Sequence, residues 1–269
     1  MSLRRHVCFF NRSYYPDRGA TGQLLTELAE DLVRDFGWRV TVVAGRPLNP
    51  DAPPVRGAGW RLVSRETRHG VEILRAGGTT LSPRRFIGRA ANYLTYFLSA
   101  CVAGLRLDPP DVVVALTDPP IIGLAARLVV RRVRARFVLL CQDVFPEVTR
   151  LLEDFHSDAV DRGLEWVSRL LIRKADRVVA VGETMRDRLV TAKGADPARV
   201  QVIHNWADCA AILPGPKRNP FSIAHGLAER FVVMHSGNVG LAQELDVLLD
   251  AAARLRDRPS PCPRARALG

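Results

Sequence analysis

The stretch from residue 6 to residue 36 constrains the fold more than any other part of the sequence. His6–Phe10 is an apolar run with the length of one buried strand. Asn11–Gly22 is rich in turn-forming residues, and Gln23–Phe36 places its leucines on one helical stripe. Thr21 is suited to be the N-cap of this helix, and Gly37 to end it. The stretch therefore predicts a strand, a loop and a helix.

Two glycines, Gly19 and Gly22, precede the predicted helix. A helix that begins after the first strand presents backbone N–H groups and the positive end of its dipole to a cleft. Such a turn can bind a phosphate or a sugar hydroxyl. The alternative is that the glycines only make the turn, and these residues alone leave both interpretations open.

The alternation of strands and helices continues along the chain. Short runs rich in valine and leucine are separated by helical segments, which favours a parallel sheet with helices on both faces. The expected fold is a doubly wound, Rossmann-like α/β domain of about seven strands. After His6–Phe10, the predicted strands are 40–44, 71–76, 111–116, 137–141, 177–181 and 200–203.

Arg84–Leu107 is a long, mostly apolar segment that is predicted to be a helix. Its apolar part has about 20 residues, the length that would span a bilayer, but Arg89 and Asn92 interrupt it. A buried or membrane-surface helix is therefore expected instead of a spanning one. The nearby arginines form either a solvated face or a patch for anionic lipid: Arg84, Arg85 and Arg89, with Arg127, Arg131 and Arg134 on one face of the next helix.

Charge and cysteine content bear on partners and compartment. The 269-residue chain has a net charge of +11, which favours anionic partners. Its arginines are scattered, without an aromatic platform or a DNA-reading motif, so nucleic acid is not expected as a partner. The five cysteines form no CxxC pair, and the apolar run after Arg4 and Arg5 is too short for a signal peptide. The expected location is cytoplasmic, with peripheral contact at the inner face of the cell membrane.

Acidic side chains follow two of the predicted strands. Asp118 comes after 111–116, and Asp143 and Glu147 come after 137–141. Ligands of open α/β sheets bind at the carboxyl ends of the strands, so these carboxylates are candidates for a site. The alternative is that they cap the segments that follow them.

The strand–helix pattern restarts late in the chain. Residues 1–212 are expected to form the first domain, 213–230 a Pro/Gly-rich linker, and 231–258 a second strand–glycine–helix unit. Residues 259–269 are expected to be an irregular tail. One strand and one helix cannot bury a core of their own. The chain is therefore expected to be a C-terminally truncated form of a two-domain protein.

Six short motifs follow one another along the chain. They are Tyr15–Gly22, Asp111–Val114 with Thr117–Pro120, Gln142–Glu147, Ala175–Val181, Ile203–Asp208 and Ser236–Gln243. With these motifs in this order, the sequence resembles a family-4-type glycosyltransferase of the GT-B fold, and it is most similar to the bacterial fucosaminyltransferase-like subgroup that builds O-antigen or capsule repeats. The resemblance covers the acceptor-side domain and only the first unit of the donor-side domain.

The resemblance implies that a sugar is transferred from a nucleotide-diphosphate donor with retention of configuration, without a metal or another cofactor. The acceptor would be a polyprenyl-diphosphate-linked saccharide at the membrane. Asp143 and Glu147 match candidate catalytic positions, and Asp118 and Asn205 are expected at the acceptor cleft. The residues expected to bind the donor and its diphosphate are Gly19, Thr21, Gly22, Gly237, Asn238, Gly240 and Gln243.

The sequence also departs from the family pattern. Gln142 stands where relatives more often have a basic residue or a histidine, and Gln243 stands where many have a cation. The paired-glutamate motif that holds the donor's sugar and ribose would lie beyond residue 269. Donor binding and turnover by this chain are therefore expected to be weak.

Two other functions stay open on the sequence alone. A non-catalytic remnant, or an acceptor- or membrane-binding module, would have the same N-terminal domain. An NAD(P)-binding oxidoreductase would share the fold. However, no GxGxxG motif follows the first strand, and Gly45 and Arg46 stand where an acidic residue would end the second.

Overall fold

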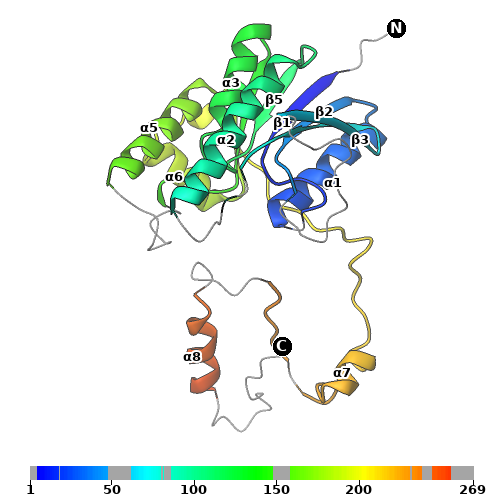
Figure 1. The fold of residues 1–269 in the computed structure, drawn as a ribbon. Helices are drawn as coiled ribbons and strands as arrows, with labels where there is room; N and C mark the ends of the chain where they lie inside the picture. The colour runs from blue at the N-terminus through cyan, green and yellow to red at the C-terminus, as the bar shows by residue number, and fades with distance from the viewer. Residues whose placement is uncertain are drawn as a thin grey trace. The chain divides into compact units, whose positions relative to one another are not determined.

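Eight strands form one sheet in the order β3-β4-β2-β1-β5-β6-β7-β8 (Figure 1). All neighbouring strands are parallel except β3 and β4, which are antiparallel. This arrangement confirms the predicted doubly wound, Rossmann-like fold. The strands are β1 (His6–Phe10), β2 (Arg39–Ala44), β3 (Val63–Arg68), β4 (Val71–Ala76), β5 (Val112–Ala115), β6 (Arg136–Cys141), β7 (Arg177–Ala180) and β8 (Val200–Val202).

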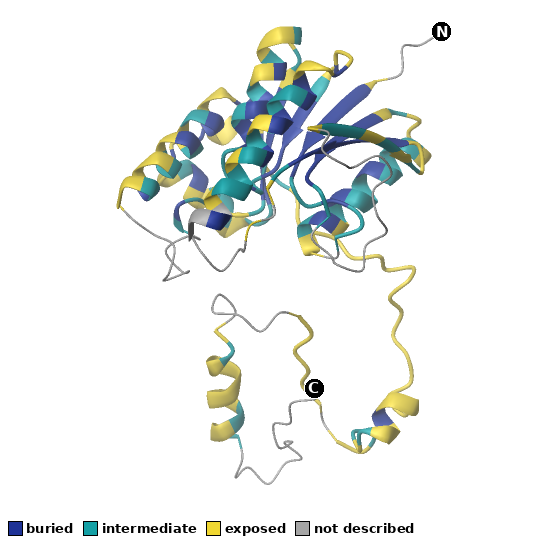
Figure 2. Cartoon of the chain, in the orientation of Figure 1, coloured by how far each residue is buried: buried dark blue, intermediate teal, exposed yellow. Residues whose placement is uncertain are grey.

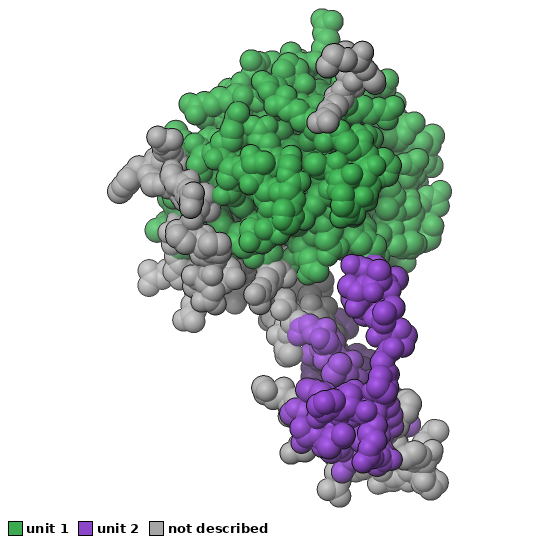
Figure 3. Space-filling model, turned by 90° about the vertical axis from the view of Figure 1, so that its right-hand side faces the viewer, with its two compact units in different colours: residues 1–206 green, residues 207–269 purple. Residues whose placement is uncertain are grey.

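The chain divides into two compact units, Met1–Trp206 and Ala207–Gly269 (Figure 3). Unit 1 contains the whole sheet, and unit 2 contains α7 (Pro220–Ala224) and α8 (Asp246–Arg254). The predicted domain limits at residues 212, 230 and 258 stay predictions. The structure is a computed structural model, and it describes residues 5–17, 19–47, 62–79, 81, 86–147, 158–230, 232–237 and 244–255.

The sequence pattern missed β3. This strand reads VSRETR, and its side chains alternate between partly buried and exposed. It lies at the edge of the sheet, where one face meets water and no continuous apolar run is needed. The seven predicted strands are present, and their ends differ from the prediction by at most one residue.

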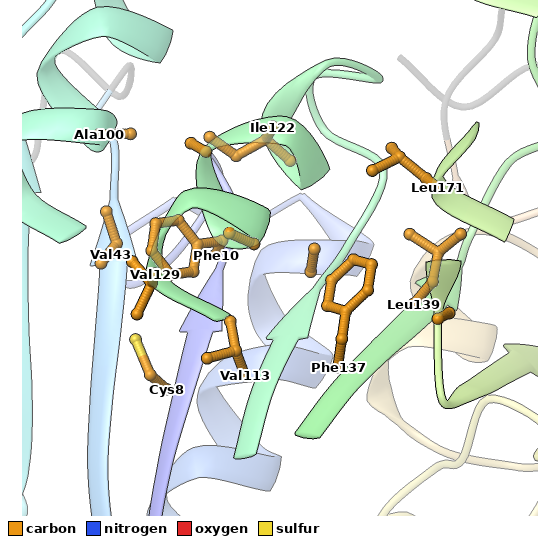
Figure 4. Close-up of a cluster of buried hydrophobic side chains, with 14 of the residues drawn as sticks. Cys8, Phe10, Val43, Ala100, Val113, Ile122, Val129, Phe137, Leu139 and Leu171 are labelled. Atoms are coloured by element: carbon orange, nitrogen blue, oxygen red, sulfur yellow. The ribbon is translucent and has the colours of Figure 1, made fainter. Parts of the chain in front are cut away.

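Side chains alternate across each strand, so the sheet has a core on each face. From β1, Cys8 and Phe10 face α2, α3, α5 and α6, whereas Val7 and Phe9 face α1. In the first core Phe10 lies close to Val129 of α3 (Figure 4). Helices thus cover both faces, as predicted. They are α1 (Ala20–Arg34), α2 (Phe86–Leu105), α3 (Ile122–Val133), α5 (Asp158–Lys174) and α6 (Glu183–Thr191).

The first helix begins earlier than predicted, and Thr21 is not its N-cap. Helix α1 starts at Ala20, and Gly19 is the N-cap. An N-cap residue has extended backbone angles, and Gly19 has them (φ −64°, ψ 144°), whereas Thr21 already lies in the helix. Gly37 follows the helix as predicted. Its φ is +62°, and its N–H donates to the carbonyl of Val33 at 3.1 Å.

Helix α2 packs one side against the sheet, where Tyr96, Ala100 and Ala103 are buried. Within the residues that the structure describes, no helix is both long and apolar enough to cross a membrane. The predicted start of this helix at Arg84 and Arg85 lies outside the described residues, as does the side chain of Arg89.

Unit 2 differs from its prediction in two places. Helix α7 lies within the predicted linker and begins with a capping box between Asn219 and Ser222. Val232–Met234 form no strand, because the described part of unit 2 offers no second strand to pair with. Helix α8 has no buried residue (Figure 2). The predicted donor residues Asn238, Gly240 and Gln243 lie outside the described residues, as does the tail 259–269.

Candidate functional site

The loops after β1, β5 and β6 meet at the carboxyl edge of the sheet. These three strands are neighbours, and β2 follows β1 on one side while β5 lies on the other. The chain connections therefore diverge between β1 and β5, and ligands of open α/β sheets bind at such a point. This edge, with Asp118 after β5 and Asp143 after β6, is the candidate site.

Asp118 joins the loop after β5 to the loop after β1. Its Oδ2 accepts a hydrogen bond from Ser13 Oγ at 2.8 Å, and its Oδ1 accepts one from Arg12 Nε at 3.4 Å. The backbone N–H of Arg12 donates to the carbonyl of Asp118 at 2.8 Å. The Arg12 guanidinium also lies 5.4 Å from the centroid of the Tyr93 ring. The carboxylate predicted for the cleft thus also fixes the first loop.

Thr117 holds the loop after β6. Its Oγ1 accepts hydrogen bonds from the backbone N–H groups of Gln142 at 3.2 Å and Asp143 at 3.3 Å. Gln142 also exchanges two 3.4 Å side-chain hydrogen bonds with Asn205, which follows β8. The structure therefore brings Asn205 to the same edge as Asp143.

Asp143 is exposed at this edge. Partial loss of water around its carboxylate and the nearby negative charge of Asp118 raise the pKa of Asp143. With Thr117 it lines a small pocket whose other walls are mostly apolar, among them Leu139 and Leu171. A carboxylate at such a position can accept a hydrogen bond from a hydroxyl or stabilise a positive charge that develops beside it.

Glu147 belongs to an ion-pair cluster at the end of the same loop. Its Oε2 lies 2.9 Å from Nζ of Lys193, and its Oε1 lies 3.8 Å from Nε of Arg188. The Lys193 side chain is 3% exposed, and it also donates to the carbonyl of Phe145 at 2.9 Å and to the carboxylate of Glu165. A buried cation between two carboxylates is a paired charge. These contacts anchor the loop after β6 to α5.

Arg75 is a second buried cation, and it holds the loop between β1 and α1. Its side chain is 2% exposed. It donates hydrogen bonds to the carbonyl of Tyr15, to the carbonyl of Gly45 at 3.2 Å, and to Oε1 of Glu66 at 2.6 Å. One guanidinium therefore connects the loops that follow β1 and β2 with strand β3.

The N-terminus of α1 opens at this edge, and no side chain caps it. Gly19 is exposed, and a Cβ added there would have open space around it. Gly22 is buried, and a Cβ added there would lie 3.3 Å from the backbone of Ser13 and 3.4 Å from that of Tyr14. Gly22 thus permits a close approach of helix and loop, while the first N–H groups of α1 lack intrahelical partners. Thr21 is partly exposed beside them.

The predicted site residues fall into three groups. Asp118, Asp143, Asn205 and the N-terminus of α1 lie at the carboxyl edge, and Glu147 lies in the ion-pair cluster. Gly237 belongs to unit 2, and it is the one donor-binding candidate of that unit among the described residues. In the described part of the chain, no three or more His, Cys, Asp or Glu side chains gather as a metal site would require.

Sequence reasoning missed the side chains that hold the site together. Arg12 and Ser13 lie in the loop after β1, and Lys193 follows α6 next to a glycine. Arg75 had the clearest signal, since it is a charged residue near the end of a strand that is otherwise mostly apolar. A cation at such a position is usually paired, but the pattern does not say with what.

Comparison with known proteins identifies the family of the domain that carries this edge. A family model described as "Glycosyl transferase 4-like domain" matches residues 19–206. The chain is 30% identical over 157 residues to a "Probable glycosyltransferase WbjE" of Pseudomonas aeruginosa, covering 58% of this chain and 39% of that protein. It is 35% identical over 96 residues to a "D-inositol 3-phosphate glycosyltransferase" of Gordonia bronchialis, covering 35% of this chain and 21% of that one. The chain thus spans well under half the length of these relatives.

Two solved structures share the fold. Anabaena HepE in complex with UDP and glucose aligns with a TM-score of 0.59 at 17% identity, over 93% of this chain and 58% of that one. Arabidopsis thaliana UGT89C1 complexed with UDP-L-rhamnose aligns with a TM-score of 0.50 at 12% identity, over 96% of this chain and 63% of that one. The family match covers most of unit 1, from the start of α1 to the end of unit 1, and includes the loops that carry Asp118, Asp143 and Asn205. This protein therefore belongs to the glycosyltransferase 4-like family.

Proposed function

We propose that this protein transfers a sugar from a nucleotide-diphosphate donor to an acceptor hydroxyl, with retention of the anomeric configuration. The observation that carries the proposal is the family match over residues 19–206, which contain Asp118, Asp143 and Asn205. It favours glycosyl transfer over the oxidoreductase alternative. Glycosyl transfer must stabilise a cationic sugar and a leaving diphosphate. At the carboxyl edge, Asp143 is suited to the first task and the N-terminus of α1 to the second.

In the proposed reaction, the acceptor oxygen bonds to the anomeric carbon as the bond from that carbon to the diphosphate breaks. The hydroxyl proton leaves with the diphosphate, and the Asp143 carboxylate stabilises the positive charge on the sugar. Glu147 was predicted to be catalytic, but its pairing with Lys193 supports a positioning role. Lys193 also holds the carbonyl of Phe145, two residues after Asp143.

The proposed donor is a nucleotide-diphosphate sugar, bound without a metal or another cofactor. Uridine is the first nucleotide to test, because HepE has been crystallised with UDP-glucose and UGT89C1 with UDP-L-rhamnose. The proposed diphosphate contacts are Gly19, Thr21 and Gly22 at α1, with Gly237, Asn238, Gly240 and Gln243 in unit 2.

The proposed acceptor is a polyprenyl-diphosphate-linked saccharide, in the assembly of O-antigen or another surface polysaccharide. The support for this acceptor is the resemblance of the motifs to the fucosaminyltransferase-like subgroup. Asp118 and Asn205 are the proposed acceptor contacts. The reaction would take place at the cytoplasmic face of the membrane.

Donor binding is tested on the 269-residue chain by thermal shift and calorimetry with UDP, GDP and their sugars. Because donor binding by this chain is expected to be weak, the expected result is a small stabilisation by one nucleotide that increases with its concentration, since a ligand that binds only the folded state raises the melting temperature. A chain that melts cooperatively and responds to none of them would contradict the donor proposal. That outcome would favour an acceptor-binding module without a donor site.

The role of Asp143 is tested by Asp143→Asn, which keeps the shape of the side chain and removes its charge. We expect transfer of labelled sugar into membrane lipid extracts to fall about 100-fold, the typical loss for one electrostatic group in a transition state. Asp187→Asn is the matched control, because Asp187 is a 74% exposed carboxylate on α6. Equal transfer rates for the two variants would show that Asp143 is not a catalytic residue.

A further inference from the structure

Thr117 and Asp143 are neighbours at the carboxyl edge of the sheet. Strands β5 and β6 are parallel and adjacent, and each of the two residues comes two positions after the end of its strand. Thr117 Oγ1 lies 3.3 Å from the backbone nitrogen of Asp143, and the Asp143 side chain branches from the atom next to that nitrogen. Both residues line the same small pocket. Their polar groups are therefore available to one ligand.

The Thr117 hydroxyl is left with a donor function only. A threonine hydroxyl has two lone pairs and one proton. Its oxygen accepts hydrogen bonds from the backbone N–H groups of Gln142 at 3.2 Å and Asp143 at 3.3 Å, which occupies both lone pairs. Among the residues that the structure describes, none accepts the hydroxyl proton. Because Thr117 is partly exposed, a ligand can reach this proton.

The Asp143 carboxylate is the complementary group. An ionised carboxylate only accepts hydrogen bonds, and no group in the described part of the chain donates one to its oxygens. The Asp118 carboxylate, by contrast, already accepts from Ser13 and Arg12. The side chains of Thr117 and Asp143 are also not hydrogen-bonded to each other. A ligand group that both donates and accepts would join them.

An alcohol hydroxyl is such a group, because it donates one hydrogen bond and accepts others. The remaining walls of the pocket are mostly apolar, with Leu139 and Leu171 among them (Figure 4). Apolar walls suit the C–H groups of the carbon that carries the hydroxyl. A phosphate or carboxylate does not fit, since it would bring a second negative charge against Asp143. Hydroxyls next to C–H groups are the repeating feature of sugars.

We propose that Thr117 is a specificity-determining residue, which donates to one hydroxyl of the bound sugar while the same hydroxyl donates to Asp143. The hydrogen bonds then run in one direction, from the Thr117 proton to the sugar oxygen and from the sugar proton to the carboxylate. A sugar without this hydroxyl would leave both side chains unpaired, and a site of this kind disfavours such an analogue. That the ligand is a sugar rests on the proposed function. The sugar belongs to the donor or to the acceptor, and the test separates the two.

The test measures sugar binding to the full 269-residue chain by calorimetry, without transfer. The donor probes are UDP-glucose and UDP-N-acetylglucosamine, with UDP as the sugar-free reference. The acceptor probes are the methyl glycosides of the same sugars. Each probe is compared with its monodeoxy analogues, and we expect one analogue to bind the wild type about tenfold more weakly than its parent. An effect among the UDP-sugars assigns the hydroxyl to the donor, and an effect among the methyl glycosides assigns it to the acceptor.

Two variants connect this hydroxyl with Thr117. Thr117→Val keeps the shape of the side chain, and we expect it to weaken binding of the parent sugar about tenfold without changing the affinity for UDP. It should add no further loss with the deoxy analogue, because the same hydrogen bond is already missing. Thr117→Ser keeps the hydroxyl and should bind within about twofold of the wild type. Thr191→Val is the matched control, because Thr191 is an exposed threonine at the end of α6.

Three results would overturn the proposal. The first is wild-type binding that is equal for every parent sugar and its deoxy analogues, or no binding of any sugar, and this comparison does not depend on the folding of a variant. The second is a loss in Thr117→Ser as large as that in Thr117→Val. The third is losses that multiply when Thr117→Val is combined with the deoxy analogue, because Thr117 would then act only through the loop that it holds. Sugar binding that depends on Thr117 without any transfer would contradict the proposed reaction alone.

Discussion

Helices α1 and α8 have similar sequence patterns and opposite environments. Each has apolar residues at helical spacing with polar residues between them. Leu25 and Ala29 of α1 are buried against the sheet of unit 1. Val247 and Leu249 of α8, in unit 2, are 64% and 58% exposed. Periodicity therefore predicts that a helix forms, but a sheet or another partner decides whether its apolar side is buried.

The strongest test of this contrast is to shorten one apolar side chain in each unit. Phe10→Ala empties a fully buried position between β1, α2 and α3, and we expect it to lower the free energy of unfolding by about 4 kcal/mol. Leu249→Ala is expected to change it by less than about 0.5 kcal/mol. Urea denaturation followed by circular dichroism measures both. Similar losses from the two variants would mean that α8 is buried in solution.

Lys193→Met should cause the next largest loss of unfolding free energy, because it removes the cation that pairs with Glu147 and Glu165. These carboxylates are 26% and 28% exposed, so we expect a loss of about 2 kcal/mol, below that of a fully buried pair. Lys217→Met, at an exposed position of unit 2, should leave the unfolding free energy nearly unchanged.

The free energy of unfolding measured at acidic pH tests the same ion pairs of Lys193 with Glu147 and Glu165. Partial burial alone would raise the pKa of Glu165, but its hydrogen bonds with Lys193 and Arg169 outweigh burial and lower it. A lowered carboxylate pKa stabilises the fold above the unfolded value, near ~4.3, and this stability is lost as pH falls through the folded value. We expect the wild type to lose more stability than Lys193→Met in this range. Parallel curves would show that the pair contributes nothing.

Replacing two helical glycines, Gly104 and Gly163, by alanine should change the stability of the fold in opposite directions. A Cβ at Gly104 would lie 2.7 Å from Val129 Cγ2 and 3.3 Å from Phe10 Cζ, so Gly104→Ala should cost about 1–2 kcal/mol by overpacking. A Cβ at Gly163 on α5 would meet nothing within 4 Å. Gly163→Ala should therefore add about 0.5–1 kcal/mol from helix propensity. A melting temperature that rises in Gly104→Ala would contradict the packing of α2 on α3, and one that falls in Gly163→Ala would contradict the open space beside Gly163.

Asp143→Asn should give the smallest change, and it should be stabilising at neutral pH. The pKa of Asp143 is raised in the folded state, so ionised Asp143 disfavours the fold once pH rises through that value. Water screens an exposed group, so the gain should be below about 0.5 kcal/mol. It should disappear near pH ~3, where both states are protonated. A variant that is less stable at pH 7 would mean that Asp143 holds the loop.

Local sequence patterns predicted the parts of the fold that are built from runs of apolar residues. The buried strands are such near-continuous runs, whereas β3 was not predicted because an edge strand needs no such run. The candidate carboxylates were predictable because Asp118 and Asp143 come two or three residues after the ends of strands. The partners of Lys193 and Arg75 were not, because Glu147 and Tyr15 are far from them in the chain and only the fold brings them together.

The Arg75 guanidinium couples the position of the loop after β1 to the position of the loop after β2. It holds the carbonyls of Tyr15 and Gly45 at the same time, from a side chain with almost no contact to water. A displacement of the first loop is therefore transmitted to the second through one rigid plane of five donors. Neither loop can be redesigned alone, and a substitution in one of them has to be judged by the position that it imposes on the other.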